Sequence, residues 1–386
     1  MNSRRDFIRN TALGLAAAAT LPALRADDPK PVPSAKPGPL SIPVDWHSHV
    51  ITPGELKFLA GRTKAPRVTF GPDGQALFEN VTTVSSAVHG ASKTAPSDIA
   101  TRIKHLDAAG VQRQLLSYTV AIGYDATIPT EELRVFYRGL NDELAEILRQ
   151  HPGRFLGVAA LPSGDPVWAA QELARAHQEL GFIGAAVPLN AYTSLESART
   201  QAPLFAAAQK FGSHVFVHRA PASPTLPGQP PLILPTDTKS VRWGVVSNTH
   251  LINGAITLGL TDFLDPYPDV TVQVIMLGGY LPYTIDSIIA SAGRAGGVKD
   301  PLARLRRIYL EPGPYSASNP DWVALAASKI GADRILFGTD YGVGGGTSTD
   351  RLAPSVAALD KVLDTDARQK IYVDNSRRLL KARGLA

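Results

Sequence analysis

Val44-Asp45-Trp46-His47-Ser48-His49-Val50 is the stretch from which the fold can be worked out. Its β-branched and aromatic residues, with Pro43 before it and Pro53-Gly54 after it, predict a short β-strand. Alternate side chains of a strand point to the same face, so His47 and His49 project together from its end. Two neutral imidazoles on rigid backbone supply half of a metal site. An isolated H-x-H pair also arises by chance, so this interpretation requires further ligands at matching positions.

Seven more strand-like runs follow this first one. Most are short and continuously apolar, which is typical of strands that are buried on both faces of a parallel sheet. The eight predicted strands span residues 44–49, 114–118, 155–160, 183–188, 214–218, 270–277, 308–311 and 335–339.

Amphipathic helical segments lie between these strands, several of them bounded by Gly or Pro. They span residues 98–109, 131–150, 166–180, 201–211, 249–262, 280–292, 321–330 and 353–381. Eight alternations of strand and helix predict an α/β fold of the (β/α)8 TIM-barrel type. A doubly wound open sheet is the alternative, because the number of strands alone does not exclude it.

Two connections are unusually long, residues 52–96 after the first strand and residues 219–248 after the fifth. Both follow the carboxyl ends of strands, where a barrel builds its active site. We expect these extended loops to act as lids or substrate walls, and the alternative is that they are plain surface loops.

The N-terminal residues are typical of a cleaved export signal. Arg4-Arg5 and Phe7 lie in a basic start, an uncharged alanine-rich run covers residues 11–24, and Ala26 offers a small residue for cleavage. The paired arginines indicate the twin-arginine type and predict a periplasmic protein. The predicted organisation is a signal peptide over 1–26, a Pro-rich linker over 27–43 and one domain over 44–386. The apolar run is too short for a stable membrane anchor.

Charge and cysteine content exclude several classes of function. Removing residues 1–26 takes away four Arg and one Asp, which leaves 35 basic and 33 acidic residues and a formal charge of +2 instead of +5. Nucleic-acid binding therefore has no support. The absence of Cys suits an oxidising compartment and excludes Cys-ligated zinc and disulfides.

Chemically active residues stand at the carboxyl ends of three predicted strands. The first strand ends in His47 and His49, the fifth in His218 and the eighth in Asp340. Three imidazoles and a carboxylate can hold one divalent ion and leave room for water or substrate. Singly, His218 could be a core histidine and Asp340 a cap. The fourth strand leads into Leu189-Asn190 and offers no Lys for a carbamate bridge, which favours a mononuclear site.

Six motifs resemble the amidohydrolase superfamily, specifically the branch related to aminocarboxymuconate-semialdehyde decarboxylase. They are D-W-H-S-H, H-L-D-A-A-G-V, H-P-G-R-F-L-G-V-A-A-L-P, F-V-H-R-A-P, F-L-D-P-Y-P-D-V and D-R-I-L-F-G-T-D-Y, spread over residues 44–380. The resemblance implies that His47, His49, His218 and Asp340 bind one divalent ion, with zinc as the first candidate and manganese as the second. It also implies a homodimer.

One residue departs from the pattern of that branch. The resemblance implies a catalytic His at the end of the sixth strand, where this chain has Leu277. Of the remaining histidines, His250 after the long fifth-strand loop and His89 in the first loop are the two that could enter the site. A surface or capping role is the alternative for both.

The resemblance and the ligand set together predict a decarboxylase of a small aromatic or unsaturated carboxylic acid. Asp340 is expected to deliver the proton that replaces carbon dioxide, with His218 beside it as the second catalytic candidate. Arg219, Arg62 and Arg67 are candidates for pairing with the substrate carboxylate, and His250 for a further contact. Hydrolysis of a lactone, ester or amide is the first alternative. A periplasmic binding protein or degenerate member that keeps the metal without turnover is the second, and the retention of all four ligands favours an enzyme over it.

Overall fold

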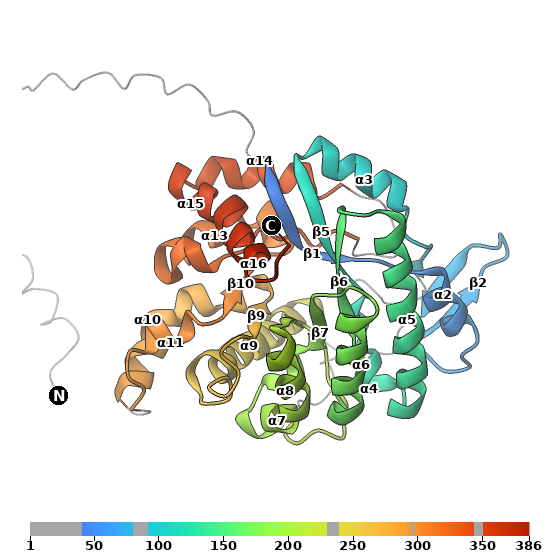
Figure 1. The fold of residues 1–386 in the computed structure, drawn as a ribbon, viewed down its shortest axis with the longest axis horizontal. Helices are drawn as coiled ribbons and strands as arrows, with labels where there is room; N and C mark the ends of the chain where they lie inside the picture. Colours follow the sequence, from blue (N-terminus) through green and yellow to red (C-terminus); the bar gives the residue numbers. More distant parts are fainter. Residues whose placement is uncertain (1–40, 80–91, 230–238, 295–296, 343–349, 386) are drawn as a thin grey trace, which may run out of the picture. The chain divides into compact units, whose positions relative to one another are not determined.

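Seven parallel strands form the centre of the molecule (Figure 1). The computed structural model describes residues 41–79, 92–229, 239–294, 297–342 and 350–385. The strands are β1 (Ile42–His49), β5 (Val111–Ser117), β6 (Phe155–Ala160), β7 (Gly184–Pro188), β8 (His214–His218), β9 (Thr271–Val274) and β10 (Tyr309–Leu310). They pair in the order β1-β5-β6-β7-β8-β9-β10. The side chains of β1, β6, β7 and β8 are buried throughout, as strands of a parallel sheet that is covered on both faces require.

The predicted eighth strand closes the sheet into a barrel without forming a regular strand. Isolated parallel bridges join Leu310 to Ile335 and Ser48 to Tyr341. On one side, the amide of Leu336 donates to the carbonyl of Leu310 at 2.8 Å. On the other side, the amide of Trp46 donates to the carbonyl of Phe337 at 2.8 Å. Backbone contacts on both sides of the segment therefore confirm the (β/α)8 barrel and exclude the doubly wound open sheet.

Helices surround the barrel. The longer ones are α3 (Ile99–Ala108), α5 (Thr130–Gln150), α6 (Pro166–Gln178), α8 (Ala202–Phe211), α9 (Lys239–Leu260), α10 (Leu281–Arg294) and α14 (Leu352–Val362). Shorter α-helices are α4 (Tyr124–Thr127), α7 (Leu195–Thr200), α11 (Pro301–Leu305), α12 (Tyr315–Ser318), α13 (Pro320–Ala326), α15 (Thr365–Gln369) and α16 (Asn375–Lys381). Turns of 3₁₀-helix cover Val120–Ile122, Leu189–Tyr192, Met276–Gly278 and Ala332–Arg334, and π-helical turns cover Ala327–Gly331 and Lys370–Asp374.

Local signals explain where several helices begin and end. The carboxylate of Asp98 accepts the amide of Thr101 at the start of α3, and Asp165 accepts the amide of Trp168 at the start of α6. Helix α8 ends at Gly212, whose φ of 57° is the left-handed conformation of a helix C-terminus. Because such signals are local, the predicted and observed bounds of these helices differ by only one or two residues.

Several predicted bounds were wrong, among them the start of β5, which begins at Val111 instead of Gln114. Helix α9 begins at Lys239, ten residues before the predicted start, so helix occupies part of the long connection after β8. Strand β9 ends at Val274, because Met276 and Leu277 have positive φ and cannot continue an extended strand. The predicted helix over 353–381 is divided into α14, α15 and α16.

The connection after β1 contains secondary structure of its own. Helix α2 (Pro53–Ala60) is followed by β2 (Arg67–Phe70), β3 (Ala76–Glu79) and β4 (Ser92–Lys93), which form a three-stranded antiparallel sheet. Figure 1 shows α2 and β2 on the side of the barrel next to α5.

The described residues, from Ser41 onward, belong to one compact unit. The predicted signal peptide, most of the predicted linker and His89 lie outside the described residues. No helix in the described part of the chain is long and apolar enough to cross a membrane.

Candidate metal centre

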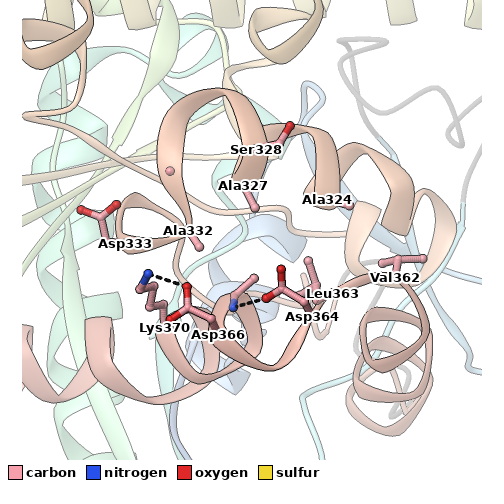
Figure 2. Close-up of a pocket in the computed structure, with 12 residues that line it drawn as sticks. Ala324, Ala327, Ser328, Ala332, Asp333, Val362, Leu363, Asp364, Asp366 and Lys370 are labelled. Carbon is pink, nitrogen blue, oxygen red and sulfur yellow. Dashed lines mark hydrogen bonds and ion pairs between the residues drawn. The ribbon is translucent and has the colours of Figure 1, made fainter. Parts of the chain in front are cut away.

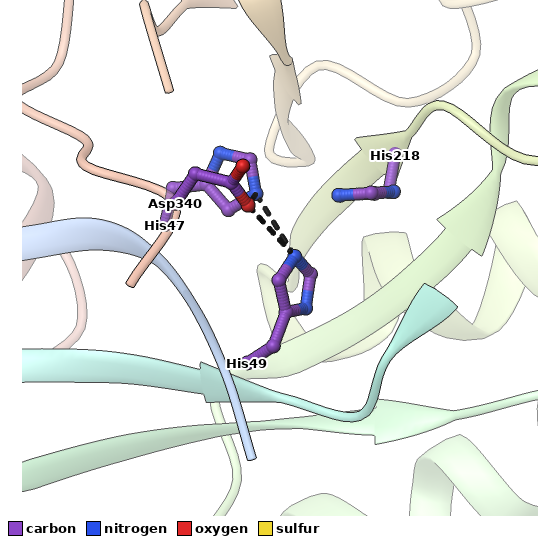
Figure 3. Close-up of side chains that lie close together, drawn as sticks. All are labelled: His47, His49, His218 and Asp340. Carbon is purple, nitrogen blue, oxygen red and sulfur yellow. Dashed lines mark hydrogen bonds and ion pairs between the residues drawn. The ribbon is translucent and has the colours of Figure 1, made fainter. Parts of the chain in front are cut away.

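Four side chains converge at one end of the barrel (Figure 3). His47 and His49 come from the end of β1, His218 from the end of β8, and Asp340 follows the segment that closes the sheet. One ligand atom from each lies within 4.8 Å of all the others, and all four residues are buried. The structure therefore brings together the four residues expected from the sequence.

Two of the imidazoles are oriented by hydrogen bonds at Nδ1, the ring nitrogen that bonds to the backbone instead of facing the cluster. Nδ1 of His49 lies 2.9 Å from the carbonyl oxygen of Tyr118, and Nδ1 of His218 lies 3.1 Å from that of Arg219. A carbonyl oxygen only accepts, so each Nδ1 carries the proton. Burial lowers the pKa of both His49 and His218, which keeps them neutral. Their Nε2 lone pairs are therefore free to bind an ion.

The Nδ1 atom of His47 contacts a carboxylate instead of a carbonyl oxygen. Its Nδ1 lies 2.8 Å from Oε1 of Glu311, which is fully buried, and Oε2 of Glu311 accepts the amide of Gly313 at 2.6 Å. Burial by itself lowers the pKa of His47, but the carboxylates of Glu311 and Asp340 raise it to about 10. A carboxylate behind a ligating imidazole is the usual partner that orients it and strengthens it as a ligand.

Asp340 points one oxygen at the imidazoles. Its Oδ1 lies 3.2 Å from Nε2 of both His47 and His49, and the two Nε2 atoms lie 3.1 Å apart. Burial raises the pKa of Asp340, but the two histidines outweigh it and hold that pKa below its usual range. Within the described residues Oδ1 is buried and has no hydrogen-bond partner. A carboxylate oxygen that faces the Nε2 atoms of two buried imidazoles is an arrangement that a divalent cation would satisfy once those nitrogens are deprotonated.

The donor set fits one divalent ion. Three imidazole nitrogens and one carboxylate oxygen are the ligands that zinc and similar ions accept. Asn190 follows β7 where a bridging Lys would be needed for a second ion. The only group of potential ligands found among the described residues is this one. The fold therefore provides a divalent metal site.

Two guanidinium groups lie near Asp340. Burial lowers the pKa of Arg219, and the charge of Asp340 opposes that shift. Nη1 of Arg351 lies 3.7 Å from Oδ2 of Asp340. The sequence predicted a substrate contact for Arg219 but gave no reason to single out Arg351, which lies outside every motif.

The other predicted substrate residues have partners elsewhere. Arg62 pairs with Glu132 and donates to the carbonyl of Pro66. Arg67 pairs with Glu79 at 2.6 Å across the β2–β3 hairpin. His250 is a partly buried residue of α9 and is not one of the four clustered residues. In this conformation none of the three is part of the metal centre, and their contact with substrate stays a prediction.

Leu277 occupies the turn after β9. It is fully buried, its φ is 56°, and its amide donates to the carbonyl of Glu311 at 2.9 Å. The turn thus supports the residue that holds His47, but it adds no titratable side chain. Glu311 was missed in the sequence, although a carboxylate at the end of the predicted seventh strand was a usable signal.

A surface pocket lies apart from this centre (Figure 2). It has a volume of about 310 Å³ and is lined by residues of α13, α14, α15 and the two π-helical turns. Its carboxylates already have partners, because Asp366 pairs with Lys370 at 2.6 Å and Asp364 accepts the amide of Ala367 at 2.7 Å. Asp333 pairs with Arg306. The pocket shares no residue with the four ligands.

Comparison with known proteins reveals clear sequence relatives. The chain matches the sequence profile of the amidohydrolase family over residues 44–382. It is 30% identical over 312 residues to the gamma-resorcylate decarboxylase of Rhizobium radiobacter, an alignment that covers 74% of this chain and 87% of that protein. It is also 30% identical over 117 residues to the 2-amino-3-carboxymuconate-6-semialdehyde decarboxylase of Dictyostelium discoideum, covering 30% of this chain and 32% of that one.

The fold is similar to a crystal structure of 5-carboxyvanillate decarboxylase from Novosphingobium aromaticivorans. The TM-score is 0.63 and the identity 19%, and the match covers 88% of this chain and 96% of that chain. That protein was crystallised with manganese and 4-hydroxy-3-methoxy-5-nitrobenzoic acid. At this identity the likeness concerns the fold alone.

Proposed function

The chain belongs to the amidohydrolase family, and from this premise we propose that it is a metal-dependent decarboxylase of a small aromatic carboxylic acid. The family and the branch expected from the six sequence motifs are confirmed. The observation that carries the proposal is the buried centre of three imidazoles and one carboxylate at the carboxyl ends of the barrel strands. Sequence relatives that decarboxylate such acids support the choice of reaction.

The residues of the centre have distinct tasks in this reaction. A divalent ion held by the four ligands would supply the positive charge that binds a carboxylate with its neighbouring hydroxyl group and withdraws electron density from the ring. Arg219, next to His218, pairs with the substrate carboxylate. Asp340, ionised in the resting site, accepts a proton from solvent and delivers it to the ring carbon that carries the carboxylate, where a C–H bond forms with ring electrons. The electron pair of the broken C–C bond returns to the ring as carbon dioxide leaves.

The identity of the ion is part of the proposal. Zinc is the first expectation from the family resemblance, and imidazole and carboxylate ligands both suit it. Manganese has the additional support of the Novosphingobium structure, which contains that ion. We therefore put manganese beside zinc as the ion to be tested. The homodimer rests on the family resemblance and is proposed as the assembly.

Release of carbon dioxide tests the proposed reaction. Purified protein loaded with Mn²⁺ or Zn²⁺ is expected to convert at least one member of a panel of hydroxybenzoic acids, including 2,6-dihydroxybenzoate and 5-carboxyvanillate, to carbon dioxide and the decarboxylated phenol. Chelator-treated protein serves as the control and is expected to be inactive, because the ion binds and polarises the substrate. Hydrolysis of lactones or esters without carbon dioxide release from any acid would select the hydrolase alternative.

Export is a separate proposal that rests on the N-terminal sequence. We propose that a twin-arginine signal carries the protein to the periplasm after folding, so that the ion is bound in the cytoplasm first. Replacing Arg4 and Arg5 with Lys is expected to leave the full-length chain in the cytoplasm, as measured by immunoblot of cell fractions. Undiminished periplasmic mature protein from that variant would contradict the proposal, and replacing Arg25 with Lys serves as a matched control.

A further inference from the structure

Asp340 has an unusual backbone conformation for a metal ligand. Its φ of 58° lies in the left-handed region, which residues other than Gly adopt only at a cost in free energy. Such a conformation persists only where the surroundings determine it. The contacts of the two residues next to it in the chain, Thr339 and Tyr341, therefore indicate what holds this ligand in place.

Thr339 is held by Asp45. The amide of Thr339 donates to Oδ1 of Asp45 at 3.0 Å, and its hydroxyl donates to Oδ2 at 2.7 Å. The same Oδ1 accepts the amide of His47 at 3.2 Å. One buried carboxylate thus joins the segment that carries His47 to the segment that carries Asp340.

Tyr341 is held by two side chains from helix α3. The guanidinium carbon of Arg102 lies 4.5 Å from the centre of the Tyr341 ring, and Nδ1 of His105 lies 2.8 Å from the Tyr341 hydroxyl. Arg102 and His105 are three residues apart, so they lie on one face of the helix. The amide of His49 also donates to the carbonyl of Tyr341 at 2.7 Å.

Arg102 connects these contacts into one network. Its Nη2 donates to the carbonyl oxygen of His49, and its Nη1 donates to Oγ of Ser48 at 3.2 Å and to Oε1 of Gln114 at 2.9 Å. The amide of the Gln114 side chain donates in turn to Oδ2 of Asp45 at 2.7 Å. The guanidinium is therefore linked to the segments that carry His47, His49 and Asp340.

The close approach of Arg102 leaves no room for a side chain at residue 342. Gly342 has a φ of 88°, and a Cβ there would lie 2.2 Å from the carbonyl oxygen of His49 and 2.9 Å from Nη2 of Arg102. Gly is the residue that accepts such a conformation and such an approach. The chain after Asp340 is thus shaped around the contact between Arg102 and His49.

A fully buried guanidinium is costly, since its desolvation must be compensated by hydrogen bonds and neighbouring charge. All of the hydrogen bonds described above for Arg102 go to the first strand or to Gln114 beside it. An apolar side chain of similar size could fill the same volume in a purely structural role. The contacts therefore point to a task at the metal centre.

We propose that Arg102 is a positioning residue of the metal centre, which acts through the carbonyl of His49 and the ring of Tyr341 to hold His49 and Asp340 in ligating geometry. The proposal rests on the metal site of the proposed function and is independent of the reaction. It concerns a helix residue that touches neither ion nor substrate.

Titration of metal-free protein with Mn²⁺ tests this role, with thermal unfolding of the metal-free form measured in parallel. We expect Arg102→Met to raise the Kd for Mn²⁺ by about 10- to 100-fold, the range typical of partners that orient metal ligands. Arg102→Lys is expected to give an intermediate Kd, because Lys keeps the charge but loses the planar fork of donors.

Arg307→Met is the matched control. Arg307 also donates to backbone carbonyls, those of Leu258 and Thr261, but it belongs to the segment between α11 and β10 and pairs with Asp265. We expect this variant to lose thermal stability while it keeps the wild-type Kd for Mn²⁺. A positioning role changes affinity, whereas a general stabilising role changes only the unfolding temperature.

Two results would overturn the role of Arg102: wild-type affinity in Arg102→Met, or an equal loss of affinity in Arg307→Met. If Arg102→Met does not fold, Arg102→Lys decides, since wild-type affinity in that variant overturns the proposal and a weakened affinity supports it. Failure of the wild-type protein to bind Mn²⁺ or Zn²⁺ would be a different result, which contradicts the metal centre itself and with it any positioning role.

Discussion

Replacing Asp340 with Asn is expected to reduce the turnover number by about 10²- to 10⁴-fold, the usual contribution of a positioned acid or base. The amide is similar in size to the carboxylate, so the side chain keeps its place beside His47 and His49. It can no longer accept and deliver a proton. The measurement is the rate of carbon dioxide release per bound metal ion, with metal content determined by elemental analysis.

A matched control separates this effect from a general change of charge. Asp265 is a half-exposed carboxylate that pairs with Arg304 and Arg307 on the protein surface. Asp265→Asn also removes one negative charge, but at a residue that is neither a ligand nor adjacent to one in the sequence. This variant is expected to keep the wild-type turnover number. Full activity of Asp340→Asn per bound ion would remove Asp340 from the proton transfer, whatever its role as a ligand.

Replacing both His47 and His49 with Ala is expected to abolish metal binding. Loss of a residue that orients a ligand through a hydrogen bond lowers metal affinity about 10- to 100-fold. Loss of two ligands must lower it by more than that range. The double variant removes two of three imidazoles and takes away the imidazole partner of the buried Glu311 carboxylate. Elemental analysis should find one divalent ion per wild-type chain and none in the variant.

The control for this variant is His177→Ala. His177 lies in α6 and contacts the hydroxyl of Ser213 at 2.7 Å, so it is a partly buried histidine outside the cluster. It should retain one ion per chain. Two ions in the wild-type protein would contradict the mononuclear site, and metal retained by the double variant would show that the ion binds elsewhere.

The four ligands could be predicted from the sequence because each stands at a position with a clear local signal. Continuous apolar runs identify buried parallel strands, and the polar residue that ends each run faces the mouth of the barrel. His218 and Asp340 satisfy this pattern, whereas His47 and His49 are alternate residues at the end of a strand bounded by Pro43 and Pro53. The structure brings the four within 4.8 Å of one another. Glu311 satisfies it too, as the last residue of the predicted seventh strand.

The long connections could not be predicted in the same detail. The segment after β1 carries a small antiparallel sheet, and α9 extends ten residues further toward the N-terminus than its periodicity indicated. Arg62 and Arg67, chosen for their place in the first loop, pair with Glu132 and Glu79. A basic residue in a loop has many carboxylates within reach, and the sequence does not say which of them the fold brings near.

By itself, then, the sequence determined the alternation of strands and helices and the positions of the four ligands, because periodicity is a local property of the chain. The tertiary structure decided that the sheet closes into a barrel, through backbone contacts of residues 335–341 with β1 and β10. Only the tertiary structure decided that Asp340 is held in a left-handed conformation by Asp45, His105 and Arg102. In the sequence Arg102 is an ordinary basic residue of an amphipathic helix, which would be expected on the surface. Its burial and its contact with the His49 carbonyl depend on how α3 packs against the barrel, and no local pattern encodes that packing.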